Sequence, residues 1–222
     1  MNVLVIDVGG THVKLLATGR RTPIKFVSGP HLTPAFMVRE ALAVTEDWRY
    51  DASTIGYPGP VAKGRPVADP HNLGKGWRRF DFRRAFGRPV RIVNDAAMQA
   101  LGSYDRGRML FLGLGTGLGT AIVEDGAVQA LELAHLPYRE GKSFEDYLGV
   151  RGLERLGRTK WERHVTIVAG MLRAAVVADH VVLGGGNVKK LRSLPPRARR
   201  GDNKNAFRGG FRVWDRGGPS RS

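Results

Sequence analysis

Residues 3–17 have the sequence VLVIDVGGTHVKLLA, and this stretch decides the fold. An apolar, β-branched run, Val3–Val8, ends at Gly9-Gly10, and a second apolar run follows at Val13–Ala17. Apolar runs bounded by glycine predict a buried strand, a tight turn and a second strand, which together form a hairpin.

Strands alternate with helices along most of the remaining chain, and this order predicts an α/β fold. Residues 61–78 form a long loop rich in Gly, Pro and Asn, and its length indicates a functional role. Residues 216–222 are expected to fray. The further strands are expected at 53–56, 90–93, 109–112, 120–124 and 181–183, and the helices at 33–42, 80–86, 95–104, 144–148 and 161–175.

The composition is that of an ordinary globular protein of 222 residues and 24.3 kDa. Because the chain has no cysteine, disulfides, thiolate zinc sites, iron–sulfur clusters and a cysteine nucleophile are excluded. No apolar run approaches the ~18 residues that a membrane span needs. The first ten residues lack a basic segment and a cleavage site, so no signal peptide is expected and a cytoplasmic location is predicted.

The charge is strongly basic, with a formal net charge of +16 and a pI near 11.0. Residues 151–222 hold 17 basic and 5 acidic side chains, a net charge of +12. Such an excess favours polyanionic partners, although a merely solvated basic surface accounts for it equally well.

Three glycine turns follow predicted strands. The first is Asp7-Val8-Gly9-Gly10-Thr11, the second is Gly113–Thr120 with four alternating glycines, and the third is Gly184-Gly185-Gly186-Asn187. Glycine lets backbone N–H groups approach an anion closely, so each turn is a candidate phosphate site, and a purely structural turn is the alternative. The second turn matches neither the dinucleotide motif nor a Walker loop.

Polar residues lie between and after these turns. Asn94-Asp95 stands at a strand end before a helix, where an Asp is either an N-cap or a rigidly held base. Glu132, His135 and Glu145 follow the second turn. They suit a hydrogen-bonding cluster for a polar ligand, and surface charge is the alternative.

These motifs, in this order, resemble the ROK family of sugar kinases, and most closely its polyphosphate-glucokinase-like branch. The resemblance also includes Gly56-Tyr57-Pro58-Gly59 and Asn72–Trp77, and it extends to about residue 212. It implies an actin-like (ribonuclease-H-like) ATPase fold of two lobes, 1–104 and 105–222, with a cleft between them. It also implies phosphoryl transfer from ATP or polyphosphate to the 6-hydroxyl of a hexose, with glucose the expected sugar.

The resemblance also implies roles for individual residues. Asp95 would be the general base, and Asp7 would hold Mg²⁺ directly or through water. The donor phosphates would be held by Gly9, Gly10, Thr11, Gly115, Thr116 and Gly117, and Gly185 and Gly186 would lie near a nucleoside. The sugar hydroxyls would be held by Asn94, Glu132, His135 and Glu145. Many relatives carry a Cys-rich zinc motif, which this chain lacks, so no zinc is expected.

Two other functions stay open: a non-catalytic sugar-binding or regulatory protein on the same fold, and a polyanion- or nucleic-acid-binding protein. The first strand begins at Val3, so a DNA-binding helix–turn–helix in front of it is not expected. Nucleases with an Asp-ended first strand need several carboxylates around two metals, and the second glycine loop has no role there. Nucleic acid and membrane are therefore not expected as partners, and a homodimer is left open.

Overall fold

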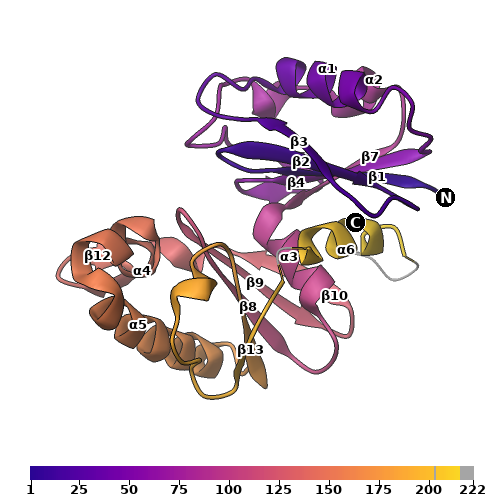
Figure 1. Ribbon diagram of the computed structural model, residues 1–222. Coiled ribbons are helices and arrows are strands. Elements are labelled where there is room, and N and C mark those ends of the chain that lie inside the picture. Colours follow the sequence, from indigo (N-terminus) through magenta and orange to yellow (C-terminus); the bar gives the residue numbers. More distant parts are fainter. Residues whose placement is uncertain (203, 216–222) are drawn as a thin grey trace.

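The computed structural model describes residues 1–202 and 204–215, so the predicted frayed end at 216–222 lies outside the described residues. Two mixed five-stranded sheets stack above one another, with two short helices between them and further helices on their outer faces (Figure 1). This arrangement confirms the α/β class that the alternation of strands and helices predicts.

The first sheet has the order β3-β2-β1-β4-β7. Strands β1, β2 and β3 are antiparallel neighbours, whereas β4 and β7 join β1 in parallel. The predicted hairpin is therefore confirmed, with Asp7 opposite Lys14. The bounds are β1 Val3–Val8, β2 His12–Ala17, β3 Ile24–Val27, β4 Ala52–Tyr57 and β7 Val90–Asn94.

The second sheet repeats this connectivity in the order β10-β9-β8-β13-β14. Its first three strands are antiparallel, and β13 and β14 join β8 in parallel. The first and second glycine turns consequently occupy equivalent places, between the first and second strands of each sheet. The bounds are β8 Met109–Leu114, β9 Leu118–Glu124, β10 Ala127–Leu131, β13 His180–Gly184 and β14 Ala198–Arg200.

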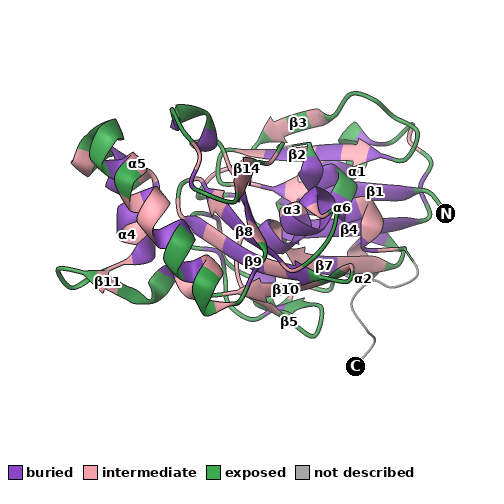
Figure 2. Ribbon diagram, turned by 90° about the horizontal axis from the view of Figure 1, so that it is seen from below, coloured by how far each residue is buried: buried purple, intermediate pink, exposed green. Residues whose placement is uncertain are grey.

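Helices cover both faces of each sheet, which explains why the central strands are buried almost throughout (Figure 2). Helices α1 and α2 cover the outer face of the first sheet, and α4 and α5 cover that of the second. Helix α5 bends at Gly157, whose φ is 72°. The bounds are α1 Pro34–Val44, α2 Phe82–Phe86, α3 Asp95–Ser103, α4 Phe144–Leu148, α5 Val150–Ala175 and α6 Asn205–Arg212.

The inner faces of the two sheets meet through α3. Its Ala96, Ala97 and Ala100 pack on Phe111 and other residues of the second sheet. Met98, on the opposite side of α3, packs with β1 of the first sheet and with α6. Helix α3 is therefore wedged between the sheets.

Helix α6 packs on α3 almost backbone to backbone. A Cβ atom on Gly102 would overlap the carbonyl oxygen of Asn205, and one on Gly209 would overlap that of Met98. On the next position, Gly210 lies against the side chain of Val5 in β1. Glycine is thus required at these three places by close contact rather than by backbone conformation.

Arginines satisfy the carbonyl groups at the end of α3. Arg212 of α6 donates to the carbonyls of Leu101 and Tyr104, at 2.8 and 2.9 Å. Arg199 of β14 donates to that of Ser103. Cations at a helix C-terminus pair with its otherwise unbonded carbonyls and its negative dipole end, so α3 is fixed at this end as well.

Every strand and helix predicted from the sequence is present, and most lie within a few residues of their expected bounds. The exception is the helix predicted at 161–175, which begins eleven residues earlier as α5, because the chain continues in a second helical segment before the bend at Gly157. The sequence prediction missed β3, β10, β14 and α6. The predicted loop at 61–78 contains a short hairpin and the 3₁₀ turn η1. The remaining short elements are β5 Val61–Ala62, β6 Arg65–Pro66, β11 Pro137–Arg139, β12 Lys142–Ser143, η1 Trp77–Arg79, η2 Leu133–His135 and η3 Val188–Lys190. Within the described ranges, none of the helices is both long and apolar enough to cross a bilayer.

The glycine contact between α3 and α6 generates a stability prediction. Gly102→Ala forces a methyl group into the backbone of α6, so we expect the free energy of unfolding to fall by about 1–3 kcal/mol in urea denaturation. The matched control is Gly170→Ala in α5, where a Cβ atom would meet nothing within 4 Å. That change should leave stability the same or raise it by up to ~1 kcal/mol. Equal stability of the two variants would contradict the close contact.

Candidate active site

Asp95 is the first residue of α3, directly after β7. The side chain of Asn94 caps the helix by accepting a hydrogen bond from Ala97 N–H at 3.0 Å, and it donates to the carbonyl of Gly59 at 3.1 Å. Both ends of this amide are therefore engaged in fixing the start of α3. Its predicted contact with a sugar stays a prediction.

The Asp95 carboxyl group has an unusual environment. Burial, reinforced by the negative charge of Asp7 and to a smaller extent by that of Glu132, raises its pKa to about 7. The backbone N–H of Ala96, 2.7 Å from Oδ1, opposes this rise. Three of the predicted site residues, from β1, α3 and the end of β10, thus lie close enough to influence one another electrostatically.

Asp7 lies near the end of β1 with Lys14 beside it on β2. The Lys14 ammonium is 4.0 Å from Asp7 Oδ2. Burial raises the pKa of Asp7, and the Lys14 charge opposes this rise. Lys14 was not singled out from the sequence, although its register opposite Asp7 follows from the hairpin.

A magnesium ion fits this position chemically, because Mg²⁺ takes one or two carboxylates together with phosphate oxygens and water. Within residues 1–202 and 204–215, no group of three or more His, Asp or Glu side chains is arranged to hold a metal by itself. Asp7 and Asp95 would gain from a divalent cation, since the charge of one carboxylate raises the cost of ionising the other.

The first glycine turn leaves its tip open. Gly9 N–H donates to the carbonyl of His12 at 3.1 Å and closes the turn. Gly10 and Thr11 are exposed, and a Cβ atom on Gly10 would meet only Asn72, at 3.9 Å. This tip has room for an anion close to its backbone.

The second and third glycine turns contact each other. The side chain of Asn187 donates to the carbonyl of Gly115 at 2.9 Å, and its N–H donates to that of Leu114. Gly185 has a φ of 86° and lies against Leu114. The carbonyl of Thr116 accepts from Val150 N–H at 3.1 Å, so the start of α5 also holds this loop. The sequence analysis includes Asn187 in the third turn but gives its side chain no role, and the structure shows that this side chain joins the two turns.

The glycines of these turns fall into two groups. A Cβ atom at Gly113 or Gly184 would press on Phe111, and one at Gly119 would overlap Ala96 of α3. These glycines are explained by packing alone. Gly115 and Gly186 have nothing within 4 Å of a Cβ atom, so space for a ligand remains over them.

Glu145 lies against the second glycine loop. Its Oε2 accepts from Leu118 N–H at 3.1 Å and occupies the space beside Gly117. Arg151 approaches its other oxygen at 3.7 Å. Glu145 is thus placed beside the predicted phosphate loop, and its predicted sugar contact is not tested by this arrangement.

Glu132 directly precedes η2 and His135 is its last residue, and both are exposed. Ala134 between them is buried, and Thr120 Oγ1 accepts a hydrogen bond from Leu133 N–H at 3.3 Å. The backbone of this short turn is therefore anchored on β9, while the two polar side chains remain free of the core.

The loop around residues 72–77 is held by Asp69, which the sequence analysis did not single out. Its carboxylate accepts from the N–H groups of Gly76, Trp77 and Arg78 at 2.8–3.3 Å. Against the effect of burial, these hydrogen bonds and the Lys75 charge hold the pKa of Asp69 below its usual range. Asp69 keeps the buried Trp77 in place beneath this loop.

The basic residues after the third turn are split between two places. Lys189 and Lys190 are exposed on η3, next to Gly186. Arg197 and Arg199 lie instead beside His180, at the opposite end of β13. These lysines and arginines therefore do not form one continuous basic surface.

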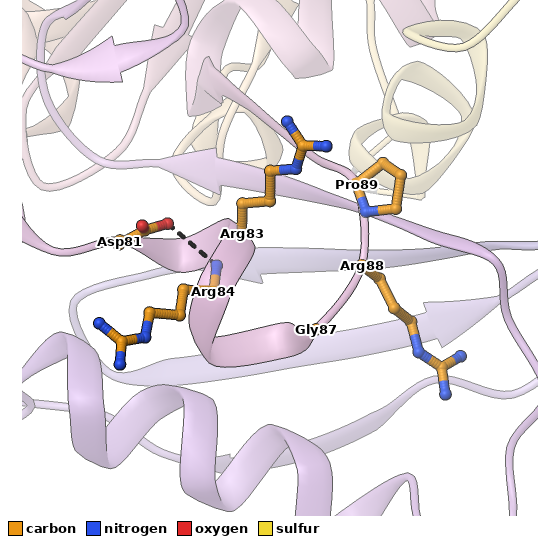
Figure 3. Close-up of a pocket in the computed structure, with 6 residues that line it drawn as sticks. All are labelled: Asp81, Arg83, Arg84, Gly87, Arg88 and Pro89. Atoms are coloured by element: carbon orange, nitrogen blue, oxygen red, sulfur yellow. Dashed lines mark hydrogen bonds between the residues drawn. The ribbon is translucent and has the colours of Figure 1, made fainter.

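A basic hollow lies on the first sheet's side of the molecule, around α2. This pocket of about 360 Å³ is lined by Asp81, Arg83, Arg84, Gly87, Arg88 and Pro89. Figure 3 shows that the three guanidinium groups point in different directions. Arg88 stacks on Tyr50, with its guanidinium carbon 4.5 Å from the ring centre. Because these arginines do not converge, the hollow is not a phosphate site of the kind that a donor needs.

The chain matches the ROK family over residues 3–130 and belongs to that family. A polyphosphate glucokinase of Mycobacterium tuberculosis is 29% identical, over 83% of this chain and 77% of that protein.

Solved structures share the fold. The inorganic polyphosphate/ATP-glucomannokinase of Arthrobacter sp. strain KM has a TM-score of 0.79 at 22% identity, over 94% of this chain and 96% of that one. A ROK family glucokinase of Streptomyces griseus, solved with glucose and AMPPNP, has a TM-score of 0.74 at 18% identity, over 95% and 98%. The fold is the actin-like ATPase fold, as the resemblance of the motifs predicts.

The raised pKa of Asp95 predicts a pH-dependent change in stability. A carboxyl group whose pKa is raised in the folded state costs stability as the pH rises from its unfolded pKa of about 4 to about 7, and the cost is constant above that. Asp95→Asn removes this cost. We expect the variant to be more stable than wild type by about 1–4 kcal/mol at pH 8, and by much less at pH 4.5, in urea denaturation. A difference that is the same at both pH values would contradict the raised pKa.

Proposed function

We propose that this protein is a sugar kinase of the glucokinase type. It transfers a phosphoryl group from ATP or polyphosphate to the 6-hydroxyl of a hexose, with glucose the expected sugar. Residues 1–104 would carry the first phosphate turn and the base, and residues 105–222 the second phosphate loop and sugar contacts. The observation that carries the proposal is the carboxyl group of Asp95, held rigidly at the start of α3 with a pKa of about 7.

Asp95 would act as the general base for the sugar hydroxyl. A base works best when its pKa lies near the working pH, because it is then both ionised and basic enough to accept a proton. Burial and the neighbouring carboxylates supply this pKa. Asn94 keeps the carboxyl group in one orientation by capping the helix.

The two open glycine turns would hold the donor phosphates. Phosphoryl transfer asks the protein mainly for positioning and for neutralisation of charge. Gly10, Thr11, Gly115 and Thr116 offer accessible backbone at the tips of these turns, and Lys14 supplies a positive charge beside Asp7. Mg²⁺ at Asp7 would supply the remaining neutralisation when bound.

The sugar would lie between the base and η2. Glu132 and His135 present exposed polar side chains from a turn whose backbone is anchored to β9. The Glu132 charge contributes to the raised pKa of Asp95, which supports a sugar contact near the proposed base.

The central test is the reaction itself. Wild type, assayed with glucose, mannose and other hexoses against ATP or polyphosphate, should form sugar 6-phosphate. Asp95→Asn should keep sugar binding in a thermal-shift assay but lose roughly 10²-fold or more in kcat, because Asn cannot accept the proton.

Near-normal kcat in Asp95→Asn would overturn the role of Asp95. Sugar binding by wild type with no turnover for any donor would favour the non-catalytic alternative, and co-purified nucleic acid without sugar binding would favour the nucleic-acid alternative.

We further propose polyphosphate as a donor beside ATP. The support is the pair of exposed lysines, Lys189 and Lys190, directly after the open Gly186, together with the polyphosphate-dependent relatives. Each cation along a chain of phosphates adds attraction that weakens steeply with salt.

The variant Lys189→Ser/Lys190→Ser tests this donor assignment. We expect the KM for polyphosphate at low salt to rise about tenfold and the KM for ATP to change much less. The control is Arg83→Ser/Arg163→Ser, which removes the same charge from exposed positions on α2 and α5. Activity with ATP alone, unaffected by added polyphosphate at low salt, would discard the polyphosphate donor and leave the sugar kinase in place.

A further inference from the structure

A second cavity lies at the far end of the second sheet from the glycine turns. Its volume is about 480 Å³. His180 begins β13 and Gly184 ends it, so about 13 Å of strand separates the cavity from the third turn. The cavity is lined by Asp105, Arg106, Gly107, Asp179, His180, Arg197, Ala198 and Arg199.

Both carboxylates of this cavity already have partners. Asp105 lies 3.3 Å from an Arg199 nitrogen and accepts from Arg106 N–H at 2.9 Å. Against the effect of burial, these groups hold the pKa of Asp105 below its usual range. Asp179 accepts from Arg108 N–H at 2.8 Å. The partner of Asp179 is a backbone group, so the charge balance of the cavity is set by its three arginines against its two carboxylates.

The basic side chains are in excess. Among the described residues, neither Arg106 nor Arg197 has a recorded acidic partner within 4 Å, and both are exposed to the cavity mouth. Arg199 Nε and His180 Nε2 are buried without a hydrogen-bond partner, although His180 Nε2 lies 3.7 Å from Asp105. An unpartnered buried N–H group such as Arg199 Nε is costly, so an acceptor that reached it would be bound favourably.

We propose that this cavity binds a small molecule bearing a phosphate group, at a site separate from the candidate active site. Guanidinium groups donate in a planar fork that matches phosphate oxygens. Those of Arg106 and Arg197 line this hollow with no acidic partner recorded among the described residues, whereas Arg199 is already bonded to Ser103 and Asp105. The volume accommodates a molecule the size of a sugar phosphate. The residues involved lie outside the kinase proposal, so the inference stands independently of it.

The cavity is also joined to α3. Arg199 donates to the carbonyl of Ser103, the last residue of the helix that begins with Asp95. An occupant of the cavity would therefore contact an arginine that holds the far end of the helix carrying the candidate base.

Histidine resonances in nuclear magnetic resonance spectra test this proposal on the intact protein. The chain has six histidines; His180 lines the cavity, whereas His12 lies at the first glycine turn and reports on the candidate active site. Separate titrations with pyrophosphate and with glucose 6-phosphate should each be followed at constant pH. We expect a saturable shift of the His180 resonance, assigned with His180→Gln, and the probe with the tighter apparent Kd identifies the ligand source.

The variant Arg106→Ser/Arg197→Ser should weaken the His180 response at least about tenfold, while leaving the His12 response unchanged. The control variant Arg83→Ser/Arg163→Ser, which loses the same charge elsewhere, should respond as wild type. No His180 shift with either probe, or equal weakening in both variants, would overturn the proposal, because the first shows an unused cavity and the second a general charge effect.

Discussion

The close contact between α3 and α6 is the constraint on which the rest of the structure depends. Three glycines bring α6 within backbone distance of α3 and against β1, so the helix that starts with Asp95 cannot shift relative to either sheet. Its other side is buried against the second sheet through alanines, and its last carbonyls are bonded to Arg199 and Arg212. A carboxyl group at the start of such a helix has a defined position between the two glycine turns, which is what general-base catalysis requires.

The same packing explains why the candidate site is glycine-rich for two different reasons. Gly119 allows β9 to lie against Ala96, and Gly113 and Gly184 make room for Phe111, so these residues build the walls. Gly10, Gly115 and Gly186 are uncovered and leave backbone accessible. Burial raises the pKa of Asp95, so ionising this carboxyl group lowers the stability of the fold. Functional sites often carry such a cost in stability.

Much of the fold followed from local patterns in the sequence. The hairpin around Gly9-Gly10 and the helix after Asn94 were predictable because apolar runs, turn glycines and a capping residue agree. Helix α6 was not, since NAFRGGFR contains two glycines that indicate a loop unless a neighbouring backbone is known to require them. Strand β14 was not predictable either, because it has only three residues and two of them are arginines, a composition that does not indicate a strand. The candidate roles of Asp95 and Glu132 came from the family resemblance and stay predictions, whereas the side-chain contact of Asn187 depends on how two turns pack against each other. Lys189 and Arg197 are close in the sequence but lie at opposite ends of β13. Their separation could not be predicted, because it depends on the position of each residue along the sheet.

The proposed function depends most directly on the Asp95 carboxyl group, which the fold holds in a half-buried, electronegative position suited to a base at neutral pH. Titration of the Asp95 side-chain carboxyl carbon by ¹³C nuclear magnetic resonance, in wild type and in Glu132→Gln, measures this directly. The account predicts a pKa of about 7 in wild type and a lower value in the variant, because the Glu132 charge contributes to the rise. A wild-type value near 4, the ordinary value for an aspartate, would contradict it.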